Sequence, residues 1–350
     1  MIRPRLLRAD NFTPPARTPW GGTRLRARFK GGAPLAADKA AYRVVGESWE
    51  VSVEPDFPSV DAEDERTLAA HIADDPRGWL GDADGFDLLV KLLDADDALS
   101  VQIHPSDDDA ALAEDEGGKP ESWYVLAAEP GAGLYLGFEE GVDEAAVRAT
   151  LEAQGDLSAL LHFVPVAPGD VFVIDAGTPH AIGPGVTLVE RQRVRAGRRG
   201  LTYRYWDWNR RYDANGRRNA GGAPRALHVE RALAVTRWDA PRGEALLERI
   251  RLRAGAADLE AAARVEPLAG PDGPVRFAPL EVARICGTGT TTLPAAPYPR
   301  GLTVVEGAVT LRGDDWQVRA ERGRSVAVPA GVGAVEVALE HGHAIIAAAP

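Results

Sequence analysis

Four side chains that could bind a metal ion stand beside predicted strands in the central part of the sequence. They are Gln102, His104, Glu121 and His180. Residues i and i+2 of a strand point to one face, so Gln102 and His104 should project together. Two imidazoles, a carboxylate and an amide oxygen, without a thiolate, suit zinc and are compatible with manganese or iron. An open coordination position would remain for water or a substrate hydroxyl.

Spacing alone leaves two explanations of these residues open, because a single histidine near a polar residue is usually structural. The order of the three stretches, each next to a strand, favours a metal site. The remaining histidines have no such context. His71, His162 and His228 are expected to be packing or surface residues, and His341 and His343 are expected at the surface.

The charge balance and the cysteine content restrict the class of protein. A net charge of −12 argues against a nucleic-acid partner, which needs a basic surface. The single cysteine, Cys286, excludes an internal disulfide and a zinc site built on several thiolates. We find no apolar run of about 18 residues and no signal-peptide pattern, so we expect a cytoplasmic protein without a membrane partner.

Short apolar segments bounded by glycine or proline predict a mostly β protein with a sandwich or barrel rather than a parallel sheet. The predicted strands are 48–53, 99–103, 123–127, 170–174, 187–190, 282–285, 302–305, 325–328 and 335–339. Helices are predicted at 63–74 and 143–162. We find neither a dinucleotide-binding motif nor a phosphate-binding P-loop. A chain of 350 residues suits two domains, and Ala, Gly and Pro increase near 240–275.

Several motifs together resemble the type I mannose-6-phosphate isomerases of the cupin superfamily. Gly169, Gly177 and His180 follow the second cupin motif, with Asp175 where proline is usual. The more specific motifs are V-K-L-L-D-A at 90–95, L-S-V-Q-I-H-P at 99–105, G-K-P-E-S-W-Y-V-L at 118–126 and T-Y-R-Y-W-D-W-N-R at 202–210. Segments 19–22, 46–50 and 227–233 also fit. The resemblance covers about residues 15–240 and is only positional beyond them.

The resemblance implies a cupin-type jelly-roll domain with helical insertions at 1–240 and a degenerate cupin-like β domain without metal ligands at 241–350. It implies a metal-dependent aldose–ketose isomerase that interconverts mannose 6-phosphate and fructose 6-phosphate through a cis-enediol. One zinc ion per chain would be held by Gln102, His104, Glu121 and His180. The family's catalytic arginine and lysine fall on Arg204 and Lys119, which would also contact the sugar phosphate, and a further glutamate falls on Glu190. We expect a monomer or a homodimer.

The stretch from Glu190 to Arg204 departs from the family pattern. It is about four residues longer than in shorter bacterial members, carries five arginines between these two residues, and has Gly200 where the family has aspartate. The arginines could strengthen phosphate binding or form a basic surface loop. The missing aspartate keeps two alternatives open, an isomerase of another sugar or phosphosugar and a non-catalytic cupin that binds sugar phosphates. A cupin dioxygenase ranks last, because Lys119 and Arg204 have no evident use in that chemistry.

Overall fold

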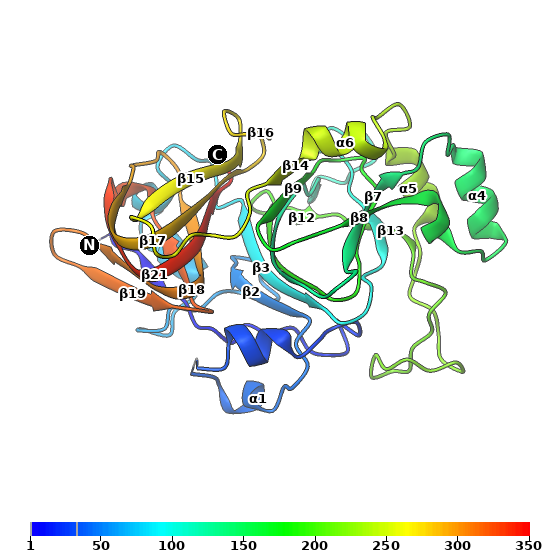
Figure 1. The fold of residues 1–350 in the computed structure, drawn as a ribbon. Helices are drawn as coiled ribbons and strands as arrows, with labels where there is room; N and C mark the ends of the chain where they lie inside the picture. The colour runs from blue at the N-terminus through cyan, green and yellow to red at the C-terminus, as the bar shows by residue number, and fades with distance from the viewer. Residues whose placement is uncertain (1, 33) are drawn as a thin grey trace.

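The computed structural model describes residues 2–32 and 34–350, and its strands form two sheets that face each other and a larger third sheet (Figure 1). The six-stranded sheet has the order β14 (Arg251–Arg253), β9 (Asp170–Ile174), β6 (Glu121–Ala128), β11 (Val186–Arg193), β3 (Leu88–Ala95) and β2 (Glu47–Val51). The five-stranded sheet has the order β13 (Tyr203–Trp206), β4 (Val101–Ile103), β10 (His180–Ile182), β7 (Gly133–Phe138) and β8 (Leu161–Pro165). A short parallel pair joins β5 (Glu116–Gly117) to β12 (Arg199–Gly200). The prediction of a mostly β protein is therefore confirmed.

The third sheet contains the C-terminal strands and the N-terminal strand β1. Its main path is β1 (Arg5–Leu6), β20 (Ser325–Val328), β18 (Arg300–Arg312), β21 (Val335–Ala348), β17 (Glu281–Leu293), β15 (Arg264–Gly270) and β16 (Val275–Arg276), and β19 (Gln317–Glu321) pairs with β18. Strand β14, at 251–253, pairs instead with β9 of the six-stranded sheet. The division of the chain after residue 240 stays a prediction.

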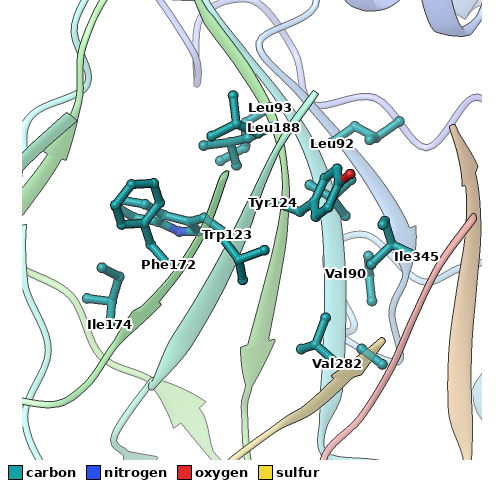
Figure 2. Packing of buried hydrophobic residues seen from close by; sticks show 14 of the residues in the cluster. Val90, Leu92, Leu93, Trp123, Tyr124, Phe172, Ile174, Leu188, Val282 and Ile345 are labelled. Carbon is teal, nitrogen blue, oxygen red and sulfur yellow. The ribbon is translucent and has the colours of Figure 1, made fainter. Parts of the chain in front are cut away.

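The six-stranded sheet is covered on both faces, which explains why all eight residues of β3 are buried. Alternate side chains of a strand point to opposite faces. Figure 2 shows Leu93 and Leu188 on one face, whereas Val90 lies on the other face near Val282 and Ile345 of the C-terminal sheet. One face of this sheet thus lines the space between the two facing sheets, and the other rests on the C-terminal sheet.

This packing corrects the expectation that His343 is a surface residue. His343 lies on β21 and is 9% exposed, with its ring centroid 5.5 Å from that of Tyr124 on β6. Burial, and then Arg284, lower the pKa of His343 to about 4, so the imidazole is neutral at pH 7. The neighbouring His341 remains exposed, as expected.

The helices are short and cover the ends of the sheets (Figure 1). The α-helices are α1 (Ala37–Ala40), α2 (Leu68–Asp74), α3 (Pro76–Leu80), α4 (Glu144–Glu152), α5 (Val229–Val235) and α6 (Gly243–Ile250). A π-helical turn, η1 (Leu25–Phe29), and two 3-10 turns, η2 (Leu157–Leu160) and η3 (Ala330–Val332), complete the set. No helix of the described residues has the length and apolar character needed to span a membrane.

Both predicted helices are shorter than expected. The first begins at Leu68, because the Oγ1 of Thr67 accepts a hydrogen bond from the backbone N–H of Ala70 and caps the helix. The prediction of one helix over 143–162 is wrong. Helix α4 ends at Glu152, and the apolar residues that follow belong to η2 and to edge strand β8.

A buried ion pair connects the N-terminal segment, strand β2 and the C-terminal sheet. Lys30 is fully buried, and its Nζ donates to Oε1 of Glu50 at 2.5 Å and to the carbonyl of Gly323 at 2.6 Å. The hydroxyls of Ser48 and Ser325 donate to the same carboxylate. Burial lowers the pKa of Lys30 while Glu50 opposes that shift, so each charge depends on the other.

We predict that Lys30→Met lowers the free energy of unfolding by about 3–5 kcal/mol, because it leaves the Glu50 carboxylate buried without a counter-charge. The double variant Lys30→Met/Glu50→Gln should recover part of this loss. Urea unfolding followed by circular dichroism measures both values. Lys39→Met, at a partly exposed position, is the control. Equal effects of Lys30→Met and Lys39→Met would contradict the prediction.

Candidate functional site

The five-stranded sheet places three of the predicted site residues side by side. Gln102 on β4 is in register with His180 on β10 and with Arg204 on β13, the strands on either side of it. Directly opposed residues on antiparallel strands have Cβ atoms about 4.5–5.5 Å apart. His104 follows the end of β4, two residues after Gln102.

The six-stranded sheet supplies the carboxylates from the opposite side of the same space. Glu190 on β11 is in register with Trp123 on β6 and with Lys91 on β3. Gln192, two residues further along β11, is in register with Glu121. The alternation of the strands therefore aligns all five polar or aromatic side chains on one face.

His104, Glu121 and His180 converge as a metal-binding group. Their ligand atoms lie within 4.8 Å of one another, and the three side chains are 1–3% exposed. Nε2 of His104 is 3.1 Å from Oε1 of Glu121 but forms no well-directed hydrogen bond. This separation is close to the 3.3 Å or so expected between neighbouring ligands of a tetrahedral zinc ion.

Hydrogen bonds at the far side of each imidazole prepare both histidines as ligands. Nδ1 of His104 lies 2.9 Å from the carbonyl of Leu201, and Nδ1 of His180 lies 2.9 Å from that of Thr178. A carbonyl only accepts, so each Nδ1 carries the proton and each Nε2 presents its lone pair. A buried Nε2 lone pair that accepts no hydrogen bond is suited to bind a metal ion.

The ionisation states also suit a divalent cation. Burial, and then His104, lower the pKa of His180 to about 3, and burial followed by Lys119 also lowers the pKa of His104. Burial opposes ionisation of Glu121, but Lys119 and His104 outweigh it and hold its pKa well below the usual value. At pH 7 the group presents two neutral imidazoles and one carboxylate, so these residues fit a metal cofactor.

Gln102 can complete the ligand group. It lines the same cavity as Glu121 and His180, and its Nε2 donates to the hydroxyl of Ser100 at 3.1 Å. The hydrogen bond engages the amide nitrogen and leaves the amide oxygen available as a donor to a metal.

Glu121 and Glu190 are neighbouring buried carboxylates that share two hydrogen-bond donors. Nε1 of Trp123 donates to Glu121 at 3.0 Å and to Glu190 at 3.2 Å. Nε2 of Gln192 donates to the same two carboxylates at 2.6 and 2.9 Å. Burial, and then the charge of Glu121, raise the pKa of Glu190 to about 8. Glu190 can therefore gain or lose a proton near neutral pH.

Two lysines face this carboxylate pair, of which sequence reasoning identified one. Nζ of Lys119 is 3.1 Å from Oε1 of Glu121, and Nζ of Lys91 is 3.5 Å from Oε2 of Glu190. Nζ of Lys91 also lies over the ring of Trp49, 4.4 Å from its centroid. The signal for Lys91 was present in the sequence, because this lysine interrupts the otherwise apolar run 88–93.

Arg204 lies at the edge of the ligand group. Its Nε donates to the hydroxyl of Ser100 at 3.1 Å, and its NH1 donates to the carbonyl of Ala226 at 2.8 Å. The same Ser100 hydroxyl accepts from Gln102, so one oxygen links the arginine to a candidate metal ligand.

The site is a small inner cavity that continues into a wide outer one. The inner cavity, of about 60 Å³, is lined by Gln102, Glu121, His180 and Glu190 among others. The outer cavity, of about 720 Å³, shares Gln102 with it and is also lined by Arg204 and the turn around 196–200. A ligand of sugar size can thus enter the outer cavity and reach the metal-binding group with one end.

The arginines of the 191–199 stretch do not act as one basic surface. Arg191 is buried on the far face of the sheet, where its NH2 donates to Ser122. Arg193 and Arg195 both pair with Asp107, Arg199 pairs with Glu116, and Arg198 lines the outer cavity. Therefore neither phosphate binding nor a basic surface loop explains the positions of all five arginines.

Gly200 lies directly against Lys119. A Cβ at this position would stand 3.2 Å from the Cγ and Cδ of Lys119 and 3.2 Å from Val194. Pairing of β12 with β5 holds the two segments together at this point. A side chain here would require Lys119 or Val194 to shift by a few tenths of an ångström, so the glycine fits the present position of that lysine.

Part of the chain is similar in sequence to known phosphomannose isomerases. Residues 16–126 match the model of the phosphomannose isomerase type I catalytic domain. The chain is 36% identical over 225 residues to the mannose-6-phosphate isomerase of Streptococcus mutans serotype c. That match covers 62% of this chain and 63% of the relative, so it spans less than two thirds of the relative's length.

Solved structures show the same fold over the whole chain. The mannose 6-phosphate isomerase of Bacillus subtilis has a TM-score of 0.76 and 24% identity, with 99% of both chains covered. The Salmonella typhimurium enzyme, in a structure described as bound to fructose 6-phosphate and zinc, has a TM-score of 0.68 and 16% identity, with both chains fully covered. The predicted cupin-type fold is therefore confirmed. The chain thus shares the fold of these enzymes, and its residues 16–126 match the phosphomannose isomerase type I catalytic domain.

Proposed function

We propose that the protein is a zinc-dependent aldose–ketose isomerase that interconverts mannose 6-phosphate and fructose 6-phosphate. The observation that carries this proposal is the convergence of the ligand atoms of His104, Glu121 and His180. Gln102 and Glu190 line the same small cavity as Glu121 and His180. The family match and the names of the relatives support the same reaction.

The four ligand residues would hold one zinc ion per chain. Other divalent metals remain compatible with the nitrogen and oxygen donors. When bound, the metal supplies an electrophile that orders the sugar oxygens and offsets negative charge on them.

Glu190 is proposed as the group that moves the proton between C2 and C1. As a carboxylate it accepts the C2 proton of the open-chain aldose, and as an acid it returns that proton to C1 of the cis-enediol, while the hydroxyl proton of O2 passes to O1. A pKa of about 8 suits both steps, because neither protonation state is strongly favoured near neutral pH. Trp123 donates to Oε1 of Glu190 and Gln192 donates to Oε2, and together they fix the orientation of the carboxylate.

Lys119 and Arg204 are proposed to stabilise the negative charge that develops on O1 and O2. Both are cations at the cavity wall, next to Glu121 and Gln102 respectively. Fixed donors in a water-poor site stabilise such charge without the cost of reorienting solvent. Lys91 is added to this set, because its Nζ faces Glu190.

We predict that removing the metal with a chelator abolishes isomerisation of mannose 6-phosphate and that added zinc restores it. His104→Ala should lose bound zinc, measured by mass spectrometry of the purified protein, because one of two neutral imidazole ligands is missing. His162→Ala, which lies outside the cavity, should retain one zinc per chain. A folded, zinc-loaded protein that converts no hexose or pentose phosphate would instead identify a binding protein.

Arg204→Ala should lower kcat/KM for mannose 6-phosphate by about 10²–10³-fold while zinc content stays at one per chain, because a fixed donor to the developing charge is lost. A coupled assay that detects fructose 6-phosphate measures the rate. Arg249→Ala on the exposed surface of α6 is the matched control and should keep full activity. Full activity of Arg204→Ala would show that its assigned role is wrong.

The activity of the zinc-loaded enzyme should rise with pH through an ionisation at or below about 8. Burial and Glu121 raise the pKa of Glu190, so the carboxylate that accepts the C2 proton forms only as the pH passes that value. Bound zinc offsets the charge of Glu121 and moves the ionisation downward. The pH profile of kcat/KM measures it. Glu190→Gln should remove most activity, and an unchanged profile in this variant would contradict the assignment.

A further inference from the structure

The outer cavity concentrates positive charge in a protein whose net charge is −12. Its walls carry the cations Arg17, Lys91, Lys119, Arg198, Arg199, Arg204 and Arg225, and the acids Glu47, Glu54, Asp56 and Asp115. A cavity lined mainly by one sign of charge focuses the field and attracts ligands of the opposite sign. The expected ligand is therefore an anion.

Most of these cations already have a carboxylate partner within the chain. Nitrogen atoms of Arg17, Lys91, Lys119, Arg199 and Arg225 lie 2.6–3.6 Å from carboxylate oxygens. Among residues 2–32 and 34–350, no carboxylate oxygen lies within 4.0 Å of a side-chain nitrogen of Arg198 or Arg204. These two guanidinium groups are the charges of the cavity that an external anion can neutralise.

The two unpaired arginines lie at different depths. Arg204 is in register with Gln102 and so stands at the metal-binding end. Arg198 lies on the exposed turn 195–198, and it lines the outer cavity but not the inner one. A sugar phosphate carries its phosphate at the opposite end from C1 and C2, so the end that remains outside meets Arg198.

The turn holds the backbone of Arg198 in place and leaves its side chain free. Its N–H donates to the carbonyl of Arg195 at 2.9 Å, and the next residue, Arg199, is fixed by pairing with Glu116. The guanidinium itself has only a 3.5 Å contact, from NH1 to the carbonyl of Glu116. A planar guanidinium with free donors is suited to bind a phosphate through two parallel hydrogen bonds.

We propose that Arg198 binds the phosphate group of the substrate at the mouth of the cavity and thereby selects phosphorylated over unphosphorylated sugars. This inference rests on the proposed isomerase function and adds a specificity residue that lies in the lengthened segment. Arg195 provides a contrast within the same turn, because its Nε lies 3.0 Å from Asp107 and it does not line the cavity.

The test compares Arg198→Ala with Arg195→Ala in the zinc-loaded protein. We expect Arg198→Ala to weaken binding of inorganic phosphate, measured by calorimetry, by about 10-fold or more, since charged hydrogen bonds are lost. The KM for mannose 6-phosphate should rise by a similar factor. Arg195→Ala should change either value by no more than about two-fold, and Arg198→Lys should recover part of the loss. Circular dichroism confirms that each variant is folded.

The binding and kinetic measurements separate the two proposals. Phosphate binding that depends on Arg198 in a protein without isomerase activity would retain the anion site and overturn the proposed reaction. Active enzyme in which both alanine variants bind phosphate equally well would overturn the role of Arg198 and leave the reaction intact. Equal weakening in both variants would also overturn it, because the effect would then come from the general field of the turn.

Discussion

The burial of Glu121 beside Glu190 is the constraint on which the rest of the site depends. Two carboxylates that share the donors Trp123 and Gln192 cannot both ionise without cations close by. The cation of Lys119 keeps Glu121 charged, whereas burial and the charge of Glu121 raise the pKa of Glu190. The repulsion between these two buried carboxylates can be reduced in two ways. A metal ion at the histidines would balance the charge of Glu121, and a proton on Glu190 removes the second charge.

The two facing sheets make this arrangement possible, because each contributes what the other lacks. The five-stranded sheet brings Gln102, His180 and Arg204 into register, and the six-stranded sheet brings the carboxylates. Behind the six-stranded sheet, Val282 and Ile345 of the C-terminal sheet pack on the far face of the strands that carry Glu121 and Glu190 (Figure 2). The C-terminal sheet therefore supports the strands that carry Glu121 and Glu190 from behind rather than lining the cavity.

Lysine is scarce in this arginine-rich chain, and most of its lysines stand where a compact positive charge balances a buried glutamate. Lys30, Lys91 and Lys119 each lie against a buried glutamate, whereas Lys39 pairs with the exposed Asp38. Lysine is a compact charge on a flexible stem, which fits a confined position where a planar guanidinium would need more donors satisfied. Arg191 illustrates that difficulty, since two of its buried nitrogens have no hydrogen-bond partner.

Local patterns in the sequence predicted the mostly β fold and the four candidate ligands, whereas Arg204 was predicted from the resemblance to the isomerase family. Strand alternation makes Gln102 and His104 neighbours wherever the strand lies. Tertiary structure alone decided which distant segments meet. It turned His343 inward, placed Lys91 against Glu190, and gave carboxylate partners to the neighbours Arg195 and Arg199 of Arg198. Those outcomes depend on register between strands and on packing of one sheet against another, which residue spacing within a segment does not encode.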